Sequence, residues 1–207
     1  LSACPATPVL DPTAVNDYLS FLAVPSPRTI YLGINKLPPA STLHCDSSGT
    51  TFHFRYWDIM DATAAGPYSG DEPEAAAELR TLLAQTVAQH CGLEPSPAVF
   101  FSGGVDSSAL LGLVNGRARD SAEAFTADFG SERSTLLSAE RDGKVSCPTE
   151  HICNAIVQFD DARFLDTVDQ VVCREDEPVG DPAALWMVGL SAAASRRGHA
   201  FALLGEG

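Results

Sequence analysis

The chain has 207 residues, enough for one domain of ordinary size with an appendage and for a substantial buried core. Its 13 basic and 27 acidic residues give a net charge of −14, which repels phosphate backbones and argues against a nucleic-acid partner. No apolar run approaches the roughly 18 residues that span a bilayer, so we expect a soluble, cytoplasmic protein with no membrane segment.

The first 70 residues predict a small appendage that packs on something larger. A helix is expected to begin at Asp11-Pro12, because this pair is typical of a helix start, and to end before Pro25. Short strands are expected at 29–34 (TIYLGI) and 51–58 (TFHFRYWD), with turn-forming segments between them.

The composition changes at 66–73, and a long helix is predicted over 74–91. Its apolar residues recur three or four positions apart, which predicts one face packed on a core. The residues expected on that face are Ala76, Leu79, Leu83, Val87 and Cys91.

Apolar strands alternate with helices from residue 97 onward. We expect strands at 97–101, 123–129, 151–157 and 200–204, and helices at 106–114, 134–144, 160–173 and 183–197. This alternation is typical of a parallel sheet covered by helices on both faces. The fold class predicted for 71–207 is therefore α/β, an open doubly wound parallel sheet, with 1–70 as its helix and strand appendage.

The segment VFFSGGVDSSALL, at 99–111, places two glycines between the first strand and its helix. Gly103 and Gly104 allow a tight turn and the close approach of a ligand. The N–H groups at the start of the following helix, with the hydroxyl groups of Ser102, Ser107 and Ser108, would form a cradle for phosphate. Asp106 fits an anion site if it holds a divalent cation against the phosphate oxygens.

The glycine loop differs from two familiar phosphate-binding loops. It has no lysine, which the GxxxxGK loop requires, and it lacks the GxGxxG spacing of dinucleotide-binding folds. The SGGVDSS pattern resembles the signature of the PP-loop ATP pyrophosphatases, whose fold is also described as adenine nucleotide alpha hydrolase-like. That resemblance implies binding of ATP and cleavage between its α- and β-phosphates, which leaves an adenylated substrate.

Further segments resemble the glutamine-dependent asparagine synthetases. They are DYLSFLAVPSPRTIYLGINKLPPAS (17–41), RYWD (55–58), DEPVGDPAALWM (176–187) and LLGEG (203–207). The resemblance implies ATP binding by Phe101, Ser102, Gly103, Gly104, Asp106, Ser107, Ser108, Ala127, Met187, Leu204 and Gly205. It also implies that Asp106 contacts Mg²⁺ and that Glu206 is the glutamate required for the chemical step.

The resemblance implies an ATP-dependent ligase that adenylates a carboxylate, by default that of aspartate, and forms an amide with ammonia from glutamine. We expect a longer protein with an N-terminal glutaminase domain, and the synthetase domain is expected to be truncated at Gly207. A homodimer is a candidate assembly.

Two departures keep other functions open. Asp128 stands where synthetases commonly have glycine, and Leu204 stands where they commonly have serine. One alternative is an adenylating cyclase of the β-lactam synthetase or lasso-peptide cyclase type, which uses an internal nucleophile. The other is a non-catalytic nucleotide-binding module.

Overall fold

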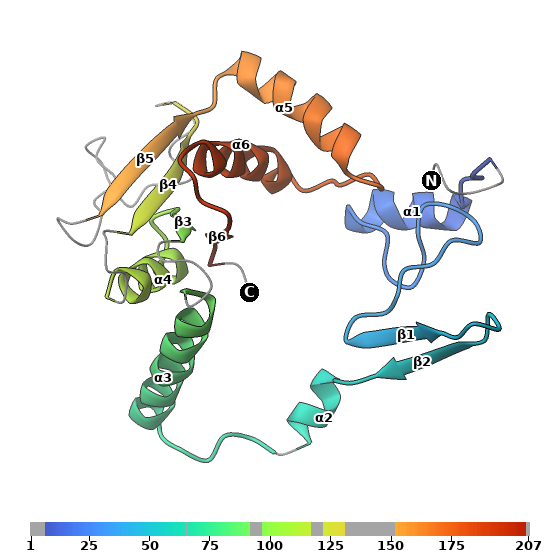
Figure 1. Ribbon diagram of the computed structural model, residues 1–207, viewed down its shortest axis with the longest axis horizontal. Helices are drawn as coiled ribbons and strands as arrows, with labels where there is room; N and C mark the ends of the chain where they lie inside the picture. The colour runs from blue at the N-terminus through green and yellow to red at the C-terminus, as the bar shows by residue number, and fades with distance from the viewer. Residues whose placement is uncertain (1–6, 65, 92–96, 117–121, 131–151, 206–207) are drawn as a thin grey trace. The chain divides into compact units, whose positions relative to one another are not determined.

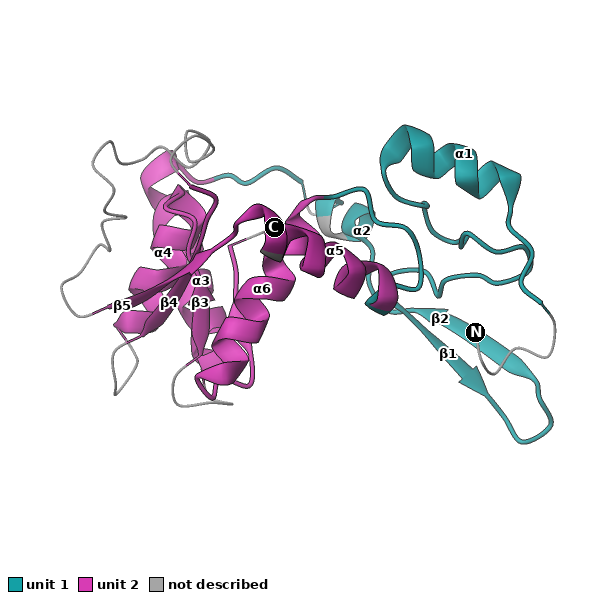
Figure 2. Cartoon of the chain, turned by 90° about the horizontal axis from the view of Figure 1, so that it is seen from above, with its two compact units in different colours: residues 1–69, 174–181 teal, residues 70–173, 182–207 magenta. Residues whose placement is uncertain are grey.

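The structure is a computed structural model that describes residues 7–64, 66–91, 97–116, 122–130 and 152–205. The chain separates into two compact units (Figure 2). Unit 1 comprises residues 1–69 and 174–181, and unit 2 comprises residues 70–173 and 182–207. None of the described helices is long and apolar enough to cross a membrane.

Unit 1 begins with the helix that the sequence predicts. Helix α1 (Pro12–Phe21) has Asp11 as its N-cap, and the Asp11 carboxylate accepts a hydrogen bond of 2.9 Å from the backbone N–H of Thr13. This cap satisfies one of the N–H groups that a helix start leaves without a partner. The helix buries Ala14 in a small core with Val24 and Ile30.

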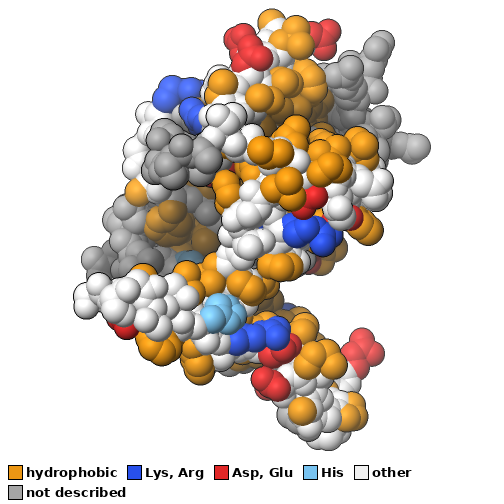
Figure 3. Space-filling model, turned by 90° about the vertical axis from the view of Figure 1, so that its right-hand side faces the viewer, with side chains coloured by type: hydrophobic (Ala, Val, Ile, Leu, Met, Phe, Trp, Pro, Cys, Tyr) orange, Lys and Arg blue, Asp and Glu red, His pale blue; other side chains and the backbone are white. Residues whose placement is uncertain are grey.

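A hairpin follows in unit 1, and here the strand prediction for 29–34 is wrong. That segment makes only isolated bridges, because Gly33 has a φ of +77° that breaks an extended backbone. The strands are β1 (Ser41–Cys45) and β2 (Thr51–Arg55), which pair antiparallel, and a short helix α2 (Ile59–Thr63) comes next. Aromatic residues on and after β2 are more than half exposed, and Figure 3 shows hydrophobic side chains at the surface of the face it draws.

The segment 174–181 belongs to unit 1 because it is anchored to the loop after α1. The carboxylate of Glu177 accepts a 2.7 Å hydrogen bond from the backbone N–H of Ile30 and forms a 2.5 Å ion pair with Lys36. Gly180 donates its backbone N–H to the carbonyl of Leu22 over 3.0 Å. A Cβ at Gly180 would lie 2.7 Å from the Cβ of Leu22, so this approach requires glycine.

Unit 2 contains the parallel sheet that the sequence predicts. Its four strands are β3 (Ala98–Phe100), β4 (Glu123–Asp128), β5 (Cys153–Gln158) and β6 (Ala202–Leu203). They lie in the order β5-β4-β3-β6, and each neighbouring pair is parallel. The predicted α/β class with an open doubly wound sheet is confirmed.

Helices cover both faces of this sheet (Figure 1). Successive side chains of β3 point to opposite faces, so Val99 packs with α4 (Val105–Asn115) and Phe100 packs with α6 (Ala183–Arg196). Gly189 of α6 is needed for close packing, because a Cβ there would lie 2.3 Å from the ring of Phe159. The amphipathic helix α5 (Asp161–Arg174) precedes the segment 174–181.

Helix α3 (Glu72–Cys91) is present, but the prediction that its whole apolar face is buried is wrong. Among the described residues of α3 only Val87 is buried, whereas Leu79 is 57% exposed and Leu83 is 41% exposed. The physical reason is that α3 packs on the core near its C-terminal end, beside α4. The predicted helix at 134–144 lies outside the described residues.

The amino end of the sheet is fixed by Glu123, the first residue of β4. One Glu123 oxygen pairs with Arg197, and the other lies 2.7 Å from Nε2 of His199. The hydrogen bond with Glu123 raises the pKa of Arg197 further above its ordinary value. Because both partners lie in the turn that joins α6 to β6, Glu123 links that turn to the first residue of β4.

Candidate functional site

The site begins where β3 ends. Phe101, directly after the last residue of β3, donates its backbone N–H to the carbonyl of Phe125 over 2.9 Å. The chain then turns at Gly103, whose φ is +79°. A side chain is disfavoured at this φ by about 1–2 kcal/mol, so the turn requires the glycine that the sequence supplies.

Two serine hydroxyl groups hold this loop against the start of α4. The Ser102 and Ser107 Oγ atoms lie 3.1 Å apart, and Ser107 Oγ lies 3.3 Å from the backbone nitrogen of Ser102, which donates to it. Ser102 Oγ accepts a 3.3 Å hydrogen bond from the backbone N–H of Gly104. Ser107 is only 5% exposed, so it supports the loop from beneath while Ser102 remains exposed.

The N-terminus of α4 is open to a ligand. Gly104 is the N-cap, and no side chain caps the helix there. Free N–H groups and the helix dipole make such a terminus attractive to anions. Asp106 lies in the first turn of α4 and is exposed. No group of three or more His, Cys, Asp or Glu side chains in the described part of the chain could hold a metal ion unaided.

The loop lies at the topological switch point of the sheet, where the strands that follow in the chain lie on opposite sides of β3. The chain passes from β3 to its neighbour β4 on one side, and it later returns to β6 on the other side of β3. In open α/β sheets, ligands bind at such a point, beyond the carboxyl ends of the strands. Here the segments after β3 and after β6 meet, because Gly205 approaches the first turn of α4.

The approach of Gly205 is close. A Cβ at this position would lie 2.9 Å from the backbone nitrogen of Ser107 and 3.0 Å from the carbonyl carbon of Asp106. Backbone atoms of a helix start cannot move aside cheaply, so only glycine allows this contact. The backbone beyond β6 is therefore held against the loop beyond β3.

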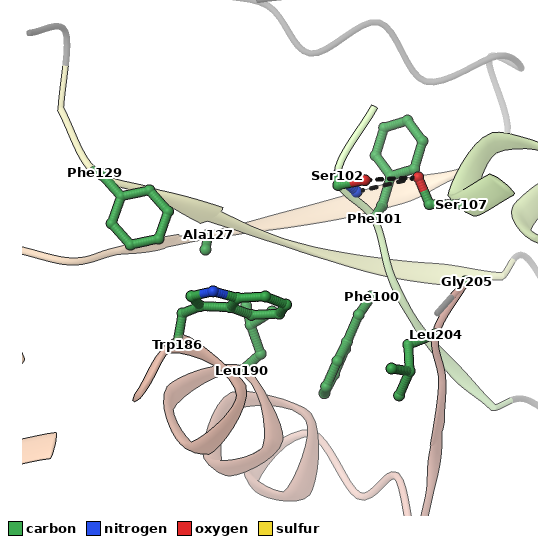
Figure 4. Close-up of a pocket in the computed structure, with 10 residues that line it drawn as sticks. All are labelled: Phe100, Phe101, Ser102, Ser107, Ala127, Phe129, Trp186, Leu190, Leu204 and Gly205. Atoms are coloured by element: carbon green, nitrogen blue, oxygen red, sulfur yellow. Dashed lines mark hydrogen bonds between the residues drawn. The ribbon is translucent and has the colours of Figure 1, made fainter. Parts of the chain in front are cut away.

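A cavity of about 220 Å³ opens beside these segments (Figure 4). Its described lining is mostly apolar and comes from β3, β4, α6 and the segments after β3 and β6: Phe100, Phe101, Ser102, Ser107, Ala127, Phe129, Trp186, Leu190, Leu204 and Gly205. Serine hydroxyl groups lie at one end, and Figure 4 shows Phe129 and Trp186 at the other end. The cavity is therefore polar at the helix N-terminus and aromatic away from it.

The backbone of β4 continues past the end of β3. Phe100 pairs with Phe125, and β4 runs on to Asp128. Because Phe125 directs its carbonyl toward Phe101, Ala127, two residues later, directs its main-chain groups to the same side. Those groups lie beyond the β3–β4 pairing and beside the cavity, where they are placed to hydrogen-bond the edge of a planar ligand.

The structure brings many of the predicted site residues together. Six of them line the cavity: Phe101, Ser102, Ser107, Ala127, Leu204 and Gly205. Four belong to the adjoining loop and first turn of α4: Gly103, Gly104, Asp106 and Ser108. Met187 is half-buried on α6 and is not among the lining residues of the described chain, and Glu206 lies outside the described residues.

Four lining residues were not predicted from the sequence: Phe100, Phe129, Trp186 and Leu190. Each has an apolar side chain in or beside a strand or helix, so the sequence alone predicts an ordinary core residue there. Trp186 and Leu190 are four residues apart on α6, so they lie on one face of that helix. That spacing is visible in the sequence and indicates a shared helix face, but it does not by itself indicate that the face lines a cavity.

Asp128, the first departure from the synthetase pattern, lies at the carboxyl edge of β4. Its two oxygens accept hydrogen bonds from Gly130 N–H at 3.0 Å and from Gln158 Nε2 at 2.7 Å. Its neighbours Ala127 and Phe129 line the cavity, so the Asp128 side chain points to the opposite face of the sheet.

The chain is similar to known proteins along most of its length. A family model described as asparagine synthase matches residues 78–207. Glutamine-hydrolysing asparagine synthetase 1 of Bacillus subtilis is 23% identical over 198 residues, which cover 96% of this chain and 30% of that protein. A Mycobacterium bovis protein, provisionally named as a glutamine-hydrolysing asparagine synthetase, is 27% identical over 177 residues, which cover 84% of this chain and 26% of that protein. The chain thus spans less than a third of the length of these curated relatives.

Proposed function

Because the chain belongs to the asparagine synthase family, we propose that it is the ATP-binding part of a carbon–nitrogen ligase. In this reaction a substrate carboxylate attacks the α-phosphorus of ATP, pyrophosphate leaves, and a nitrogen nucleophile then displaces AMP to form an amide. Aspartate is the default carboxylate and ammonia from glutamine is the default nucleophile, since the curated relatives are named as glutamine-hydrolysing asparagine synthetases. A glutaminase domain in the same protein would supply that ammonia.

The observation that carries the proposal is the polarity of the cavity. A nucleotide has an anionic end and a flat aromatic end, and the cavity has a helix N-terminus with serine hydroxyl groups at one end and aromatic side chains at the other. At about 220 Å³ the cavity is smaller than the roughly 300–1,000 Å³ that enclose a drug-sized ligand. It therefore suits the nucleoside part of ATP, with the phosphates along the loop outside it.

Roles for the loop residues follow from this orientation. The N–H groups around Gly103 and Gly104 and the hydroxyl groups of Ser102 and Ser108 would bind phosphate oxygens. Main-chain groups of Ala127 would meet the edge of the base, and those of Leu204 and Gly205 would border the nucleotide on the other side. Met187 would contact the adenosine only at its margin, since it does not line the cavity.

Asp106 would bind Mg²⁺ together with the phosphates. Mg²⁺ is commonly held by one or two carboxylates plus phosphate oxygens and waters, so one exposed carboxylate in the first turn of α4 fits its requirements. When bound, the ion supplies charge neutralisation for the leaving pyrophosphate. Glu206 follows Gly205 directly and would act on, or position, the group that arrives at the activated carboxylate.

A second candidate is an adenylating cyclase with an internal nucleophile. It is favoured by Leu204, which lines the cavity where synthetases commonly have serine, whereas Asp128 faces away from the cavity. Both candidates share the first step, and they differ in whether ammonia is required for product formation.

The proposal is tested by product analysis of the full-length protein with ATP, Mg²⁺, aspartate and ammonia. We expect AMP and pyrophosphate rather than ADP and phosphate. Asp106→Asn should lower pyrophosphate release by more than about a hundredfold, because metal stabilisation of the leaving group is worth several kcal/mol. Asp61→Asn, which changes an exposed aspartate in the first turn of α2, is the matched control and should have no effect.

The two variants also separate a chemical role from a structural one. Removal of one carboxylate from a helix start costs about 0.3–1 kcal/mol, so both variants should remain folded. Formation of ADP would contradict cleavage between the α- and β-phosphates. Unchanged pyrophosphate release by Asp106→Asn would contradict the metal-binding role of Asp106.

A further inference from the structure

Trp186 is a large aromatic residue of α6 whose side chain lines the cavity. Its indole lies flat beneath Ala127, between the rings of Phe129 and Phe100, and lines the cavity (Figure 4). The residue is half-buried, so its indole is partly packed on the core beneath the sheet and partly open to the cavity. Its neighbour four residues later, Leu190, supports it from the same face of α6.

The end of the cavity that Phe129 and Trp186 line has few polar side-chain groups with which to recognise a ligand. Among the described lining residues the hydroxyl groups of Ser102 and Ser107 lie at the opposite end, and the one polar side-chain group at this end is the indole N–H of Trp186 itself. A ligand group at the Trp186 end must therefore be recognised by apolar contact, by stacking, by main-chain groups or by that single N–H. Aromatic side chains bind nucleic-acid bases by stacking, which contributes substantially to affinity and needs no side-chain hydrogen bonds.

We propose that Trp186 is the stacking platform for the nucleobase and sets the affinity for nucleotides over base-free phosphates. This inference rests on the proposed binding of ATP in the same cavity. The main chain of Ala127 would meet the edge of the base, while the indole contacts its face. Trp186 is thus a binding residue for the base, and it takes no part in the chemistry at the phosphates.

The test compares Trp186→Leu and Trp186→Phe in binding of ATP and of inorganic tripolyphosphate, both with Mg²⁺. Leucine keeps apolar contact and loses the stacking surface, so ATP affinity should fall roughly 5- to 150-fold. Phenylalanine should restore most of the affinity. Tripolyphosphate carries the charge of the triphosphate without a base, so its affinity should stay unchanged in both variants.

A fluorescence measurement keeps the inference testable if Trp186→Leu does not fold. The chain has two tryptophans, and Trp57 in unit 1 is 55% exposed. Trp57→Phe should retain the fluorescence change on ATP addition, and Trp186→Phe should diminish it. Tripolyphosphate should leave the emission of Trp186 unchanged.

The outcomes separate this inference from the proposed function. If the wild-type protein binds ATP but Trp186→Leu binds it equally well, the stacking role is wrong and the proposed function stands. Equal losses for ATP and tripolyphosphate would assign Trp186 to the packing of α6 and overturn the inference. Absence of ATP binding by the wild-type protein would overturn both.

Discussion

Gly205→Ala tests whether the contact between the two loops positions the nucleotide. The added Cβ would lie 2.9 Å from the backbone nitrogen of Ser107, closer by 0.5 Å than the 3.4 Å at which ordinary contact begins. The nearest atoms belong to the first turn of α4, so the backbone beyond β6 must move outward. Overpacking of this kind costs about 1–3 kcal/mol of stability.

The same displacement should weaken ATP binding. Loss of one hydrogen bond to a charged phosphate costs about 1.5–3 kcal/mol, which corresponds to a roughly 10- to 150-fold lower affinity. Urea unfolding measures the stability, and calorimetric titration with ATP and Mg²⁺ measures the affinity.

Gly112→Ala is the matched control, because Gly112 lies within α4 and a Cβ there would meet nothing within 4 Å. This substitution should stabilise the protein by about 0.4–1 kcal/mol and leave ATP affinity unchanged. A Gly205→Ala variant that binds ATP as tightly as the wild type would refute the reasoning, even if its stability fell.

Three further predictions concern the glycine loop, the proposed role of Glu206 and the hairpin. Gly103→Ala should lower the free energy of unfolding by about 1–2 kcal/mol in urea, because φ is +79° there and a side chain is strained even in open space. Glu206→Gln should leave calorimetric ATP binding nearly intact while amide formation falls by about 10²-fold or more, and an intact product rate would remove Glu206 from the chemistry. Ser48→Ala should raise the pKa of Asp46, measured by NMR titration, because the Ser48 hydroxyl is the main cause that lowers it. A carboxyl group whose pKa is lowered by folding stabilises the protein at pH values above its unfolded-state pKa, and this stability is lost as the pH falls through the folded-state pKa. The Ser48→Ala variant should therefore lose less stability in acid than the wild type. An unchanged pKa of Asp46 in the variant would contradict this reasoning.

The glycine loop at 102–108 could be predicted because its conformation is set locally. A glycine pair between an apolar strand and a helix predicts a tight turn, and Gly103 has the positive φ that such a turn needs. The position of the loop at the carboxyl end of β3 follows from the alternation of strands and helices. These features need no knowledge of distant contacts.

The aromatic end of the cavity could not be predicted in the same way. Met187 was named from the family resemblance, whereas its neighbour Trp186 lines the cavity. Adjacent residues on an α-helix point about 100° apart, since the helix has 3.6 residues per turn. Which of them faces a cavity depends on how α6 packs on the sheet, and periodicity does not determine that packing.

Helix α3 also shows that hydrophobic periodicity does not determine how a helix packs. The spacing of Leu79, Leu83 and Val87 indicates an apolar face, and the structure contains that face. Only Val87 is buried, because a periodic pattern specifies which residues share a face and not whether another element covers it. The sequence does not predict strand β1, because its residues are mixed in polarity and all but the first of them are exposed.

The acidity of the chain limits the ways in which the proposed site could bind an anion. The net charge of −14 repels phosphate, and the segment 102–108 contains no lysine or arginine. Attraction must come from the N–H groups of the loop and of α4, which carry only partial charges. Neutralisation of a bound triphosphate would then require a cation, which we propose that Asp106 holds. We therefore expect nucleotide binding to depend strongly on Mg²⁺, because the segment 102–108 has an aspartate and no basic side chain.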